Sequence, residues 1–405
     1  MSLSHEDVRA TDSGGDVDES DISSLLEMLS HVTEKRGLRG RVYGLVFMMA
    51  ASLIAVLAGA SNYRQVADQI EDFPPSLMRK LAARWCYFQT GFRRPSAKTV
   101  RLVLSGIDAD QFDAAAGEWL RERAKPAPDG TMAVAIDGKV LRGAWTDENK
   151  KFTLFSAMIH ELGVTVAQVR VPAGTNEITQ VTELLDTLPM RNGERVVVTM
   201  DAAHTQRDTA EYITATRGFT YIMNVKGNQP TLLDSVFEKC LPLLSVEPDH
   251  VIEERGHGRV NRWSTWIAEA TGIDFPYART IGCIRRDTFN LIGERTSKEL
   301  AWIISGNSDG QARIATAGHL SHFVRQHWGI ENKSHYVRDM TWHEDANQAH
   351  TGSGPQVMAT LRNIAAGLIR LNGTNAIKRT TERITRNPLR ALAIIATVRH
   401  QGHSL

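Results

Sequence analysis

The spacing of hydrophobic residues divides the chain into helical and strand-like stretches. Between residues 23 and 125, apolar side chains recur at three- and four-residue intervals, as in Leu25, Met28 and Leu29, which is the period of an amphipathic helix. We therefore expect an all-helical N-terminal domain over residues 23–125. Residues 1–22 combine acids, serine and glycine with almost no large apolar side chains, a composition typical of a disordered acidic tail.

One uncharged segment of this region, Val42 to Ala60, is long enough to cross a bilayer. It is rich in alanine and glycine, it follows a long and mostly polar stretch, and no second span comes after it. These features favour a helix that is buried inside the N-terminal helical domain. We therefore expect no association with a membrane.

A different pattern begins after the turn-forming residues Lys125–Gly130. Short runs rich in valine, isoleucine and threonine now alternate with helical stretches, and the predicted order over residues 131–227 is β-β-β-α-β-α-β. This order is the ribonuclease H-like arrangement, an α/β layer in which helices cover a sheet. The expected strands are Met132–Ile136, Phe152–Ile159, Val164–Val171, Val196–Met200 and Thr220–Val225, with helices over Asn176–Leu188 and Arg207–Arg217.

The remainder of the chain divides into two parts. Residues 228–306 contain further strand-like stretches, such as Ser264–Ala270 and Thr280–Ile284, and we interpret them as a β-rich insertion. Residues 307–405 are predicted to form the C-terminal helical part of the core and a tail. A chain of 405 residues with 42% hydrophobic and 23% charged residues is an ordinary globular protein of two or three domains.

Two aspartates follow apolar strand-like runs. Asp137 comes after Met132–Ile136, and Asp201 comes after Val196–Met200. If these strands are neighbours, both carboxylates converge at one end of the sheet, and their mutual repulsion requires a divalent cation. Mg²⁺ is the expected cation, and Mn²⁺ can substitute for it.

A third carboxylate is needed to complete such a site. Glu331 supplies it from a helical stretch in which Trp328 and Ile330 are expected to anchor the helix. Two metal ions held about 3.5 to 4 Å apart can activate water or a DNA hydroxyl and stabilise the leaving oxygen. We therefore predict that Asp137, Asp201 and Glu331 are both the metal ligands and the catalytic acids.

Cationic residues near these acids, and others in a basic cluster of the N-terminal helical domain, are candidates for contacts with DNA phosphates. The formal net charge of +1 averages an acidic start with basic stretches, so the distribution of charge is more informative than the sum. For each candidate the alternative is an ordinary surface charge, and for Arg338 it is a structural salt bridge. The candidates are Arg93, Arg94, Lys98, Lys139, Arg142, Lys226, His257, Arg259, Arg262, Arg325, His327 and Arg338.

Two other classes of chemistry are disfavoured. The three cysteines, Cys86, Cys240 and Cys283, lie far apart without a CxxC pair, so neither a disulfide framework nor a zinc ribbon is indicated. This usage fits a reducing cytosol. No GxxxxGK[ST] loop is present, and His343-Glu344 is followed by Asn347 where a zinc protease helix needs histidine.

Several motifs together resemble the DDE-class insertion-sequence transposases, and specifically their H-repeat-associated branch, over nearly the whole chain. The motifs are Ala135–Lys139 with Arg142-Gly143, Thr175–Ile178, Asp201–Gln206, Asn224–Gln229, Arg325–Asn332, His335-Tyr336 and Trp342–Asp345. The resemblance implies that Glu331 is the third catalytic acid. The wider superfamily carries a Tyr-Arg-Glu-Lys signature on this helix, and the matching positions here are Val324, His327, Glu331 and Arg338.

The family implies an enzyme that pairs the ends of a mobile element, hydrolyses the phosphodiester at each end and joins the freed 3′-hydroxyl to target DNA. The expected partner is double-stranded DNA, both terminal inverted repeats and target. Two element ends must meet, so a homodimer on DNA is expected, in the bacterial cytoplasm near the nucleoid. The alternatives are a nuclease of the same fold without strand transfer and a DNA-binding protein that retains only the scaffold.

Overall fold

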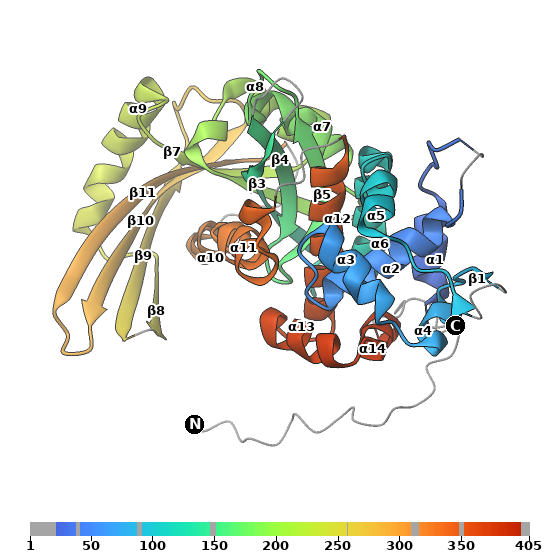
Figure 1. Ribbon diagram of the computed structural model, residues 1–405. Coiled ribbons are helices and arrows are strands. Elements are labelled where there is room, and N and C mark those ends of the chain that lie inside the picture. The colour runs from blue at the N-terminus through green and yellow to red at the C-terminus, as the bar shows by residue number, and fades with distance from the viewer. Residues whose placement is uncertain are drawn as a thin grey trace, which may run out of the picture.

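The structure is a computed structural model that describes residues 22–37, 41–86, 91–145, 151–256, 258–308, 316–347 and 352–397. Its centre is a nine-stranded mixed sheet with the strand order β5-β4-β3-β6-β7-β11-β10-β9-β8 (Figure 1). The strands are β3 (Thr131–Trp145), β4 (Lys151–Ile159), β5 (Val164–Val171), β6 (Arg195–Met200), β7 (Thr220–Val225), β8 (His250–Gly256), β9 (Arg259–Glu269), β10 (Ala278–Asn290) and β11 (Arg295–Gly306).

The first five of these strands follow the predicted order of elements. β3, β4 and β5 pair as antiparallel neighbours, whereas β6 and β7 continue the sheet parallel to β3. The crossover from β5 to β6 contains η3 (Glu177–Gln180) and α7 (Val181–Asp186). The crossover from β6 to β7 contains η4 (Ala202–His204), α8 (Arg207–Glu211) and η5 (Tyr212–Thr216). The apolar runs of β3 and β6 are buried, as expected for central strands of a covered parallel sheet.

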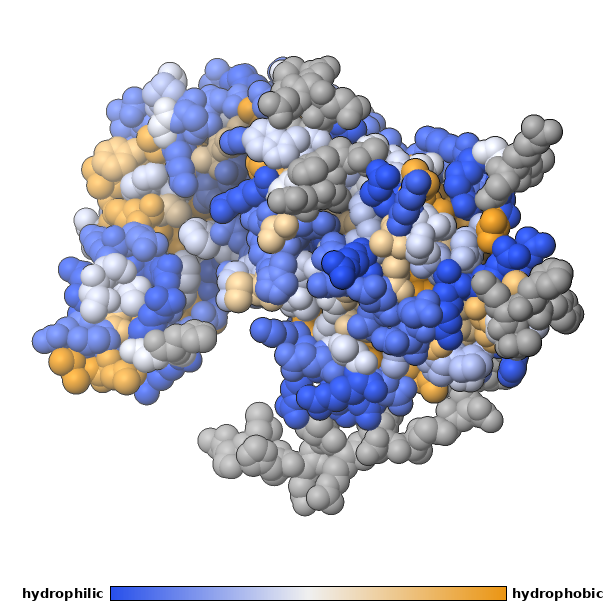
Figure 2. Space-filling model, in the orientation of Figure 1, coloured by the Kyte–Doolittle hydropathy of each residue, from blue (hydrophilic) through white to orange (hydrophobic). Residues whose placement is uncertain are grey.

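The segment predicted as a β-rich insertion does form strands, but these strands extend the central sheet. β11 pairs antiparallel with β7, and β10, β9 and β8 follow as an antiparallel meander. In Figure 1 this half of the sheet curves away from the rest, with α9 (Pro230–Cys240) packed against it and η6 (Leu241–Ser245) following. The β10–β11 turn exposes Leu291 and Ile292, and Figure 2 shows apolar surface at the tip of this half of the sheet.

The N-terminal region is helical, as predicted, except for a short ribbon of β1 (Trp85–Cys86) and β2 (Gly91–Phe92). Of the predicted tail, residues 1–21 lie outside the described residues, and Ile22 is buried in the core. The helices are α1 (Ser23–Ser30), α2 (Leu45–Leu57), α3 (Tyr63–Glu71), α4 (Pro75–Lys80), α5 (Ala97–Leu104) and α6 (Ala109–Arg123).

The uncharged segment forms α2, and all of its residues except Val46 are buried. It packs against α12 (Gly354–Leu371) and against α3. Within the described ranges, no helix combines the length and the apolarity that crossing a bilayer requires. The apolar surface of α2 is therefore covered by other helices, as the composition of this segment predicted.

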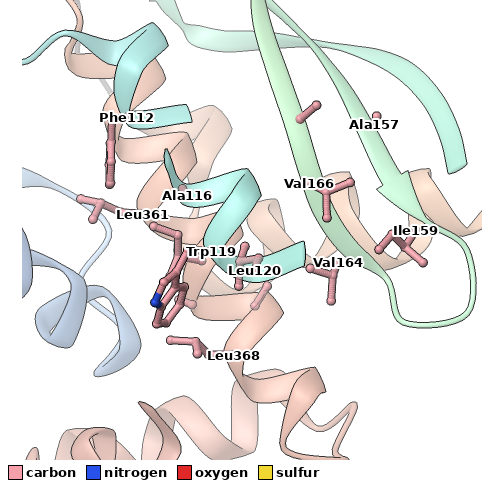
Figure 3. Packing of buried hydrophobic residues seen from close by; sticks show 14 of the residues in the cluster. Phe112, Ala116, Trp119, Leu120, Ala157, Ile159, Val164, Val166, Leu361 and Leu368 are labelled. Atoms are coloured by element: carbon pink, nitrogen blue, oxygen red, sulfur yellow. The ribbon is translucent and has the colours of Figure 1, made fainter. Parts of the chain in front are cut away.

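One hydrophobic cluster joins these helices to the sheet. Figure 3 shows Trp119 and Leu120 of α6 between Val164 of β5 and Leu368 of α12. The C-terminal part of the chain is also helical. Its elements are α10 (Ala317–His327), η7 (Ile330–His335), α11 (Tyr336–Trp342), η8 (Glu344–Ala346), α12, α13 (Ile377–Arg386) and α14 (Leu389–Thr397). Leu25, Met28 and Leu29 of α1, near one end of the chain, and α12, near the other, therefore belong to the same core.

Candidate active site

Asp201 lies where the sequence predicts, directly after β6. The strand is buried along its apolar run, and it ends where Asp201 caps the short helix η4 by accepting a hydrogen bond from the backbone N–H of Ala203 at 3.0 Å. About half of the Asp201 side chain is exposed. The carboxylate is thus fixed at the carboxyl end of a central parallel strand and remains accessible.

Asp137 does not follow a strand, and this prediction is wrong in its local detail. β3 continues to Trp145, and Asp137 pairs with Ser156 of β4. The parallel pairing with β6, however, ends at Ala135 and Thr199. Asp137 therefore lies two residues beyond the point where β6 leaves the ladder, at the same end of the parallel strands as Asp201.

Glu331 is carried by η7, a π-helical turn that follows α10. Ile330 anchors this turn, because its side chain is buried against Ala135 and Met158 of the sheet. The prediction that Trp328 is a second anchor is wrong, since its side chain is 59% exposed. Packing of Ile330 against β3 holds Glu331 close to the strand that carries Asp137.

The electrostatics of Asp137 show that these acids share one region. Burial raises the pKa of Asp137, and the charges of Glu177, Asp201 and Glu331 raise it further, to about 7, while the backbone N–H of Gly138 opposes the shift. No lysine or arginine is among the largest contributions to this shift. The donors are carboxylate oxygens, the ligands that Mg²⁺ prefers. Within the described ranges, no three His, Cys, Asp or Glu side chains are gathered as closely as metal ligands.

Glu177 is the acid that the sequence analysis did not select. It begins η3, whose first turn is capped by the side chain of Asn176. One of its carboxylate oxygens, Oε2, lies 3.6 Å from Nε2 of His204. Glu177 was visible in the Thr175–Ile178 motif, but an acid in the first turn of a helix is ordinarily explained by the helix dipole.

His335 borders Asp137, and its surroundings favour the neutral imidazole. His335 Nδ1 lies 3.6 Å from Oδ2 of Asp137. Burial lowers the pKa of His335 to about 3, and the charges of Arg338 and Lys139 also lower it. His335 was part of a motif in the sequence, but nothing in its spacing placed it beside Asp137.

His327 was predicted to contact phosphate, yet its side chain is buried. Its Nδ1 lies 3.0 Å from Oγ1 of Thr199, which in turn lies 2.8 Å from Nε2 of His160. Burial lowers the pKa of His327 to about 4. The imidazole of His327 therefore contacts Thr199 of β6 and does not face solvent, because α10 packs against the sheet.

Arg338 is likewise buried, and the structural salt bridge is the alternative that the structure shows. Its Nε donates to Oε2 of Glu344 at 2.8 Å, and one terminal nitrogen donates to Oδ1 of Asn363 at 3.2 Å. Lys139 is also buried, and its Nζ lies 2.7 Å from Oδ2 of Asp339. Neither cation reaches the surface, since acids on the C-terminal elements engage both.

Two further predicted DNA contacts have structural partners. Arg325 pairs with Glu254 of β8 and lies over the ring of Trp263 at 5.6 Å, which joins α10 to the curved half of the sheet. Arg94 donates to the backbone carbonyls of Ile70, Glu71 and Phe73. In both cases the guanidinium is used within the fold.

The remaining predicted contacts are more open. The Arg142 side chain is 81% exposed, although its Nε lies 3.4 Å from Oδ2 of Asp345. Arg93 is half-buried, and its backbone N–H donates to the carbonyl of Arg84. His257 lies outside the described residues. The exposed cations are Lys98, Lys226, Arg259 and Arg262.

Two known protein families match the sequence of this chain. The family described as "Transposase DDE domain" matches residues 128–368, which is more than half of the chain, and "DDE_Tnp_1-associated" matches residues 26–120. The chain therefore belongs to the DDE transposases, as the sequence motifs indicated. A domain of this family implies an enzyme that cleaves DNA.

The relatives point to the same branch. The chain is 28% identical over 363 residues to "Putative transposase YncI" of Escherichia coli O157:H7, covering 86% of this chain and 88% of that protein. It is 26% identical over 366 residues to "H repeat-associated putative transposase YhhI" of Escherichia coli strain K12, covering 86% and 91%. The predicted resemblance to the H-repeat-associated branch is thereby confirmed.

Proposed function

We propose that this protein is the transposase of a bacterial insertion sequence, which binds the ends of its element and catalyses metal-dependent DNA cleavage and strand transfer. The observation that carries the proposal is that the negative charges of Asp201 and Glu331 act on the partly buried carboxyl group of Asp137 and raise its pKa. These three residues are distant in sequence, so the fold alone accounts for their proximity. Membership in the DDE family supports the same assignment.

The topology supports a ribonuclease H-like core as the scaffold. Three antiparallel strands, β3 to β5, are followed by β6 and β7, which lie parallel to β3 with helical crossovers between them. In open sheets of this kind, ligands bind outside the carboxyl ends of the parallel strands. Asp137 and Asp201 lie at that end.

In the proposed reaction the protein positions charge and performs little covalent chemistry of its own. Bound Mg²⁺ would supply the activation of the attacking oxygen and the stabilisation of the leaving oxygen. Asp137, Asp201 and Glu331 would hold the cations through their carboxylate oxygens. His335 lies beside Asp137 with a pKa lowered to about 3, which favours its neutral form, and the ammonium group of Lys139 is engaged by Asp339.

The exposed cations are the remaining candidates for contacts with DNA phosphates, namely Lys98, Arg142, Lys226, Arg259 and Arg262. Phosphate contacts position a duplex and carry no sequence information of their own. Joining two element ends requires two active sites, which favours a homodimer on DNA, and such an enzyme would act in the bacterial cytoplasm.

The test is a strand-transfer assay with purified protein, Mg²⁺ and DNA that carries the inverted repeats flanking the gene. Joined products are the expected result. Cuts without joining would identify a nuclease of the same fold, and binding without cuts would identify a DNA-binding protein. Either outcome would overturn the proposal.

A further inference from the structure

Glu177 lies among the proposed metal-binding acids and has no assigned role. Resting on the function proposed above, we propose that Glu177 is a fourth carboxylate of the active site, which helps to hold the divalent cations, and that the buried imidazole of His204 positions it. The substrate class is unchanged; the inference adds a ligand and its supporting residue. Three observations carry it.

The first observation is that the missing side chain of Gly138 leaves the space that the Glu177 carboxylate occupies. A Cβ atom added at residue 138 would overlap both carboxylate oxygens and the carboxyl carbon of Glu177. Gly138 has no positive φ, so its backbone conformation does not call for glycine, whereas the close approach of the Glu177 carboxylate leaves no room for a Cβ atom unless that carboxylate moves. The glycine next to Asp137 thus admits Glu177 into direct contact with the strand that carries the first catalytic acid.

The second observation is His204, whose side chain is 1% exposed. Its Nε2 lies 3.6 Å from Oε2 of Glu177 and 4.0 Å from Oδ1 of Asp201. The ring stacks on Phe155 of β4 with a centroid distance of 5.1 Å. Its Nδ1 is buried and has no hydrogen-bond partner among the described residues, so the imidazole makes its polar contacts only on the side that faces the two acids.

The third observation concerns the ordinary explanation of Glu177 as an acid that stabilises the start of a helix. Such an acid interacts with the free N–H groups of the first turn. Within the part of the chain that the structure describes, no backbone N–H donates to the Glu177 carboxylate, and the side chain of Asn176 caps this turn instead. The Glu177 carboxylate is directed across to β3 and His204, away from its own helix.

The experiment measures the binding of Mn²⁺ to the full-length protein without DNA, by titration with electron paramagnetic resonance detection of free Mn²⁺. Glu177→Gln keeps the size of the side chain and removes its charge. We expect an affinity for Mn²⁺ about tenfold weaker, in the range found when groups around a metal site are altered. The matched control is Glu183→Gln, an exposed acid six residues further along, which should leave the affinity unchanged.

Gly138→Ala tests whether the position of the Glu177 carboxylate matters, without removing any acid. The new methyl group would displace the flexible end of Glu177, so the protein should fold while its Mn²⁺ affinity falls about as far as in Glu177→Gln. The double variant should be no weaker than either single variant, because both changes act through one carboxylate. Gly44→Ala, where an added Cβ meets nothing within 4 Å, is the control. Circular dichroism and thermal unfolding verify folding in every variant.

The outcomes separate this inference from the proposed function. If Asp137→Ala loses Mn²⁺ binding while Glu177→Gln binds as the unaltered protein does, the inference is overturned and the metal site stands. Additive losses in the Gly138→Ala and Glu177→Gln double variant would also overturn it. If neither the unaltered protein nor any variant binds Mn²⁺, both proposals fail together.

Discussion

Two carboxylates in this protein, the partly buried Asp137 and the buried Glu344, have opposite electrostatic environments. Burial raises the pKa of Asp137, and three neighbouring acids raise it further, to about 7. Burial also tends to raise the pKa of Glu344, but the charges of Arg338 and Arg362 more than offset that effect and lower it to about 2. The fold neutralises Glu344 with its own cations. Among the described residues it offers Asp137 no such partner, and that contrast separates a structural ion pair from a candidate cation site.

One short stretch of chain contributes to both regions. Glu331 of η7 belongs to the acidic set, whereas Arg338 of α11, seven residues later, enters the ion pair with Glu344. In the sequence both residues are charged positions on one helical segment. Their roles differ because Arg338 is covered by η8 and α12, while Glu331 remains exposed.

The largest expected effect is on the acidic side of this comparison. Asp201→Asn keeps the cap on η4 but removes a negative charge, and DNA cleavage should fall by at least about 1,000-fold, as when one member of a catalytic unit is removed. Asp137→Ala should behave in the same way, with DNA binding changed only a few-fold. Gel assays of cleavage and binding measure both. The control is Asp208→Asn, which changes an exposed acid on α8. If Asp201→Asn cleaves DNA as fast as this control, the assignment of Asp201 is contradicted.

Glu344→Gln should have the next largest effect, and the effect should be on stability. The change leaves Arg338 and Arg362 buried without their counter-charge, which costs about 3 to 5 kcal/mol of unfolding free energy. Denaturation in urea measures this loss, with the exposed Glu382→Gln as the control. A loss below about 1 kcal/mol would mean that solvent reaches this pair.

The pH dependence of stability should differ in sign between the two carboxyl groups. The folded pKa of Glu344 is lowered, so its stabilising contribution is complete above about pH 4.5 and is lost as the pH falls toward 2. The folded pKa of Asp137 is raised, so the folded state loses stability as the pH rises from about 4 to 7. Asp137→Asn should remove the part of this loss that falls between pH 5 and 8, about 3 kcal/mol, in metal-free urea denaturation over that range. An unchanged slope would contradict the shared acidic environment.

The smallest expected effect concerns the exposed cations. Lys226→Ala should weaken DNA binding a few-fold and reduce the slope of log affinity against log salt by about 1, because one phosphate contact is lost. Titrations at several salt concentrations measure the slope. Lys239→Ala, on α9, is the control. Equal slopes for the two variants would remove Lys226 from the DNA-binding surface.

The order of elements and the position of Asp201 could be predicted from the sequence because both depend on local patterns. An apolar run of strand length predicts a buried strand, and the residue after it lies at the edge of the sheet. The same logic misplaced Asp137, since Gly138-Lys139 has the composition of a turn although β3 keeps its pairing with β4. Glycine at residue 138 makes room for Glu177, which only the tertiary structure shows.

The cations were harder to assign because their partners decide their roles. Arg338, Lys139 and Arg325 are engaged by Glu344, Asp339 and Glu254, respectively. These acids are ordinary charged positions in the sequence, and no periodicity indicates which arginine each will face. Exposed and buried cations therefore have the same local signature.

The indole N–H of Trp342 donates to the backbone carbonyl of Val56 at 2.8 Å, and this bond has a consequence for how the molecule can be divided. Trp342 adjoins the ion pair of Glu344, and Val56 is in the helix that α12 covers. Cutting the chain near residue 128 would strip α12 of its apolar cover and leave the indole without an acceptor. The N-terminal helices and the sheet are therefore expected to fold as one unit.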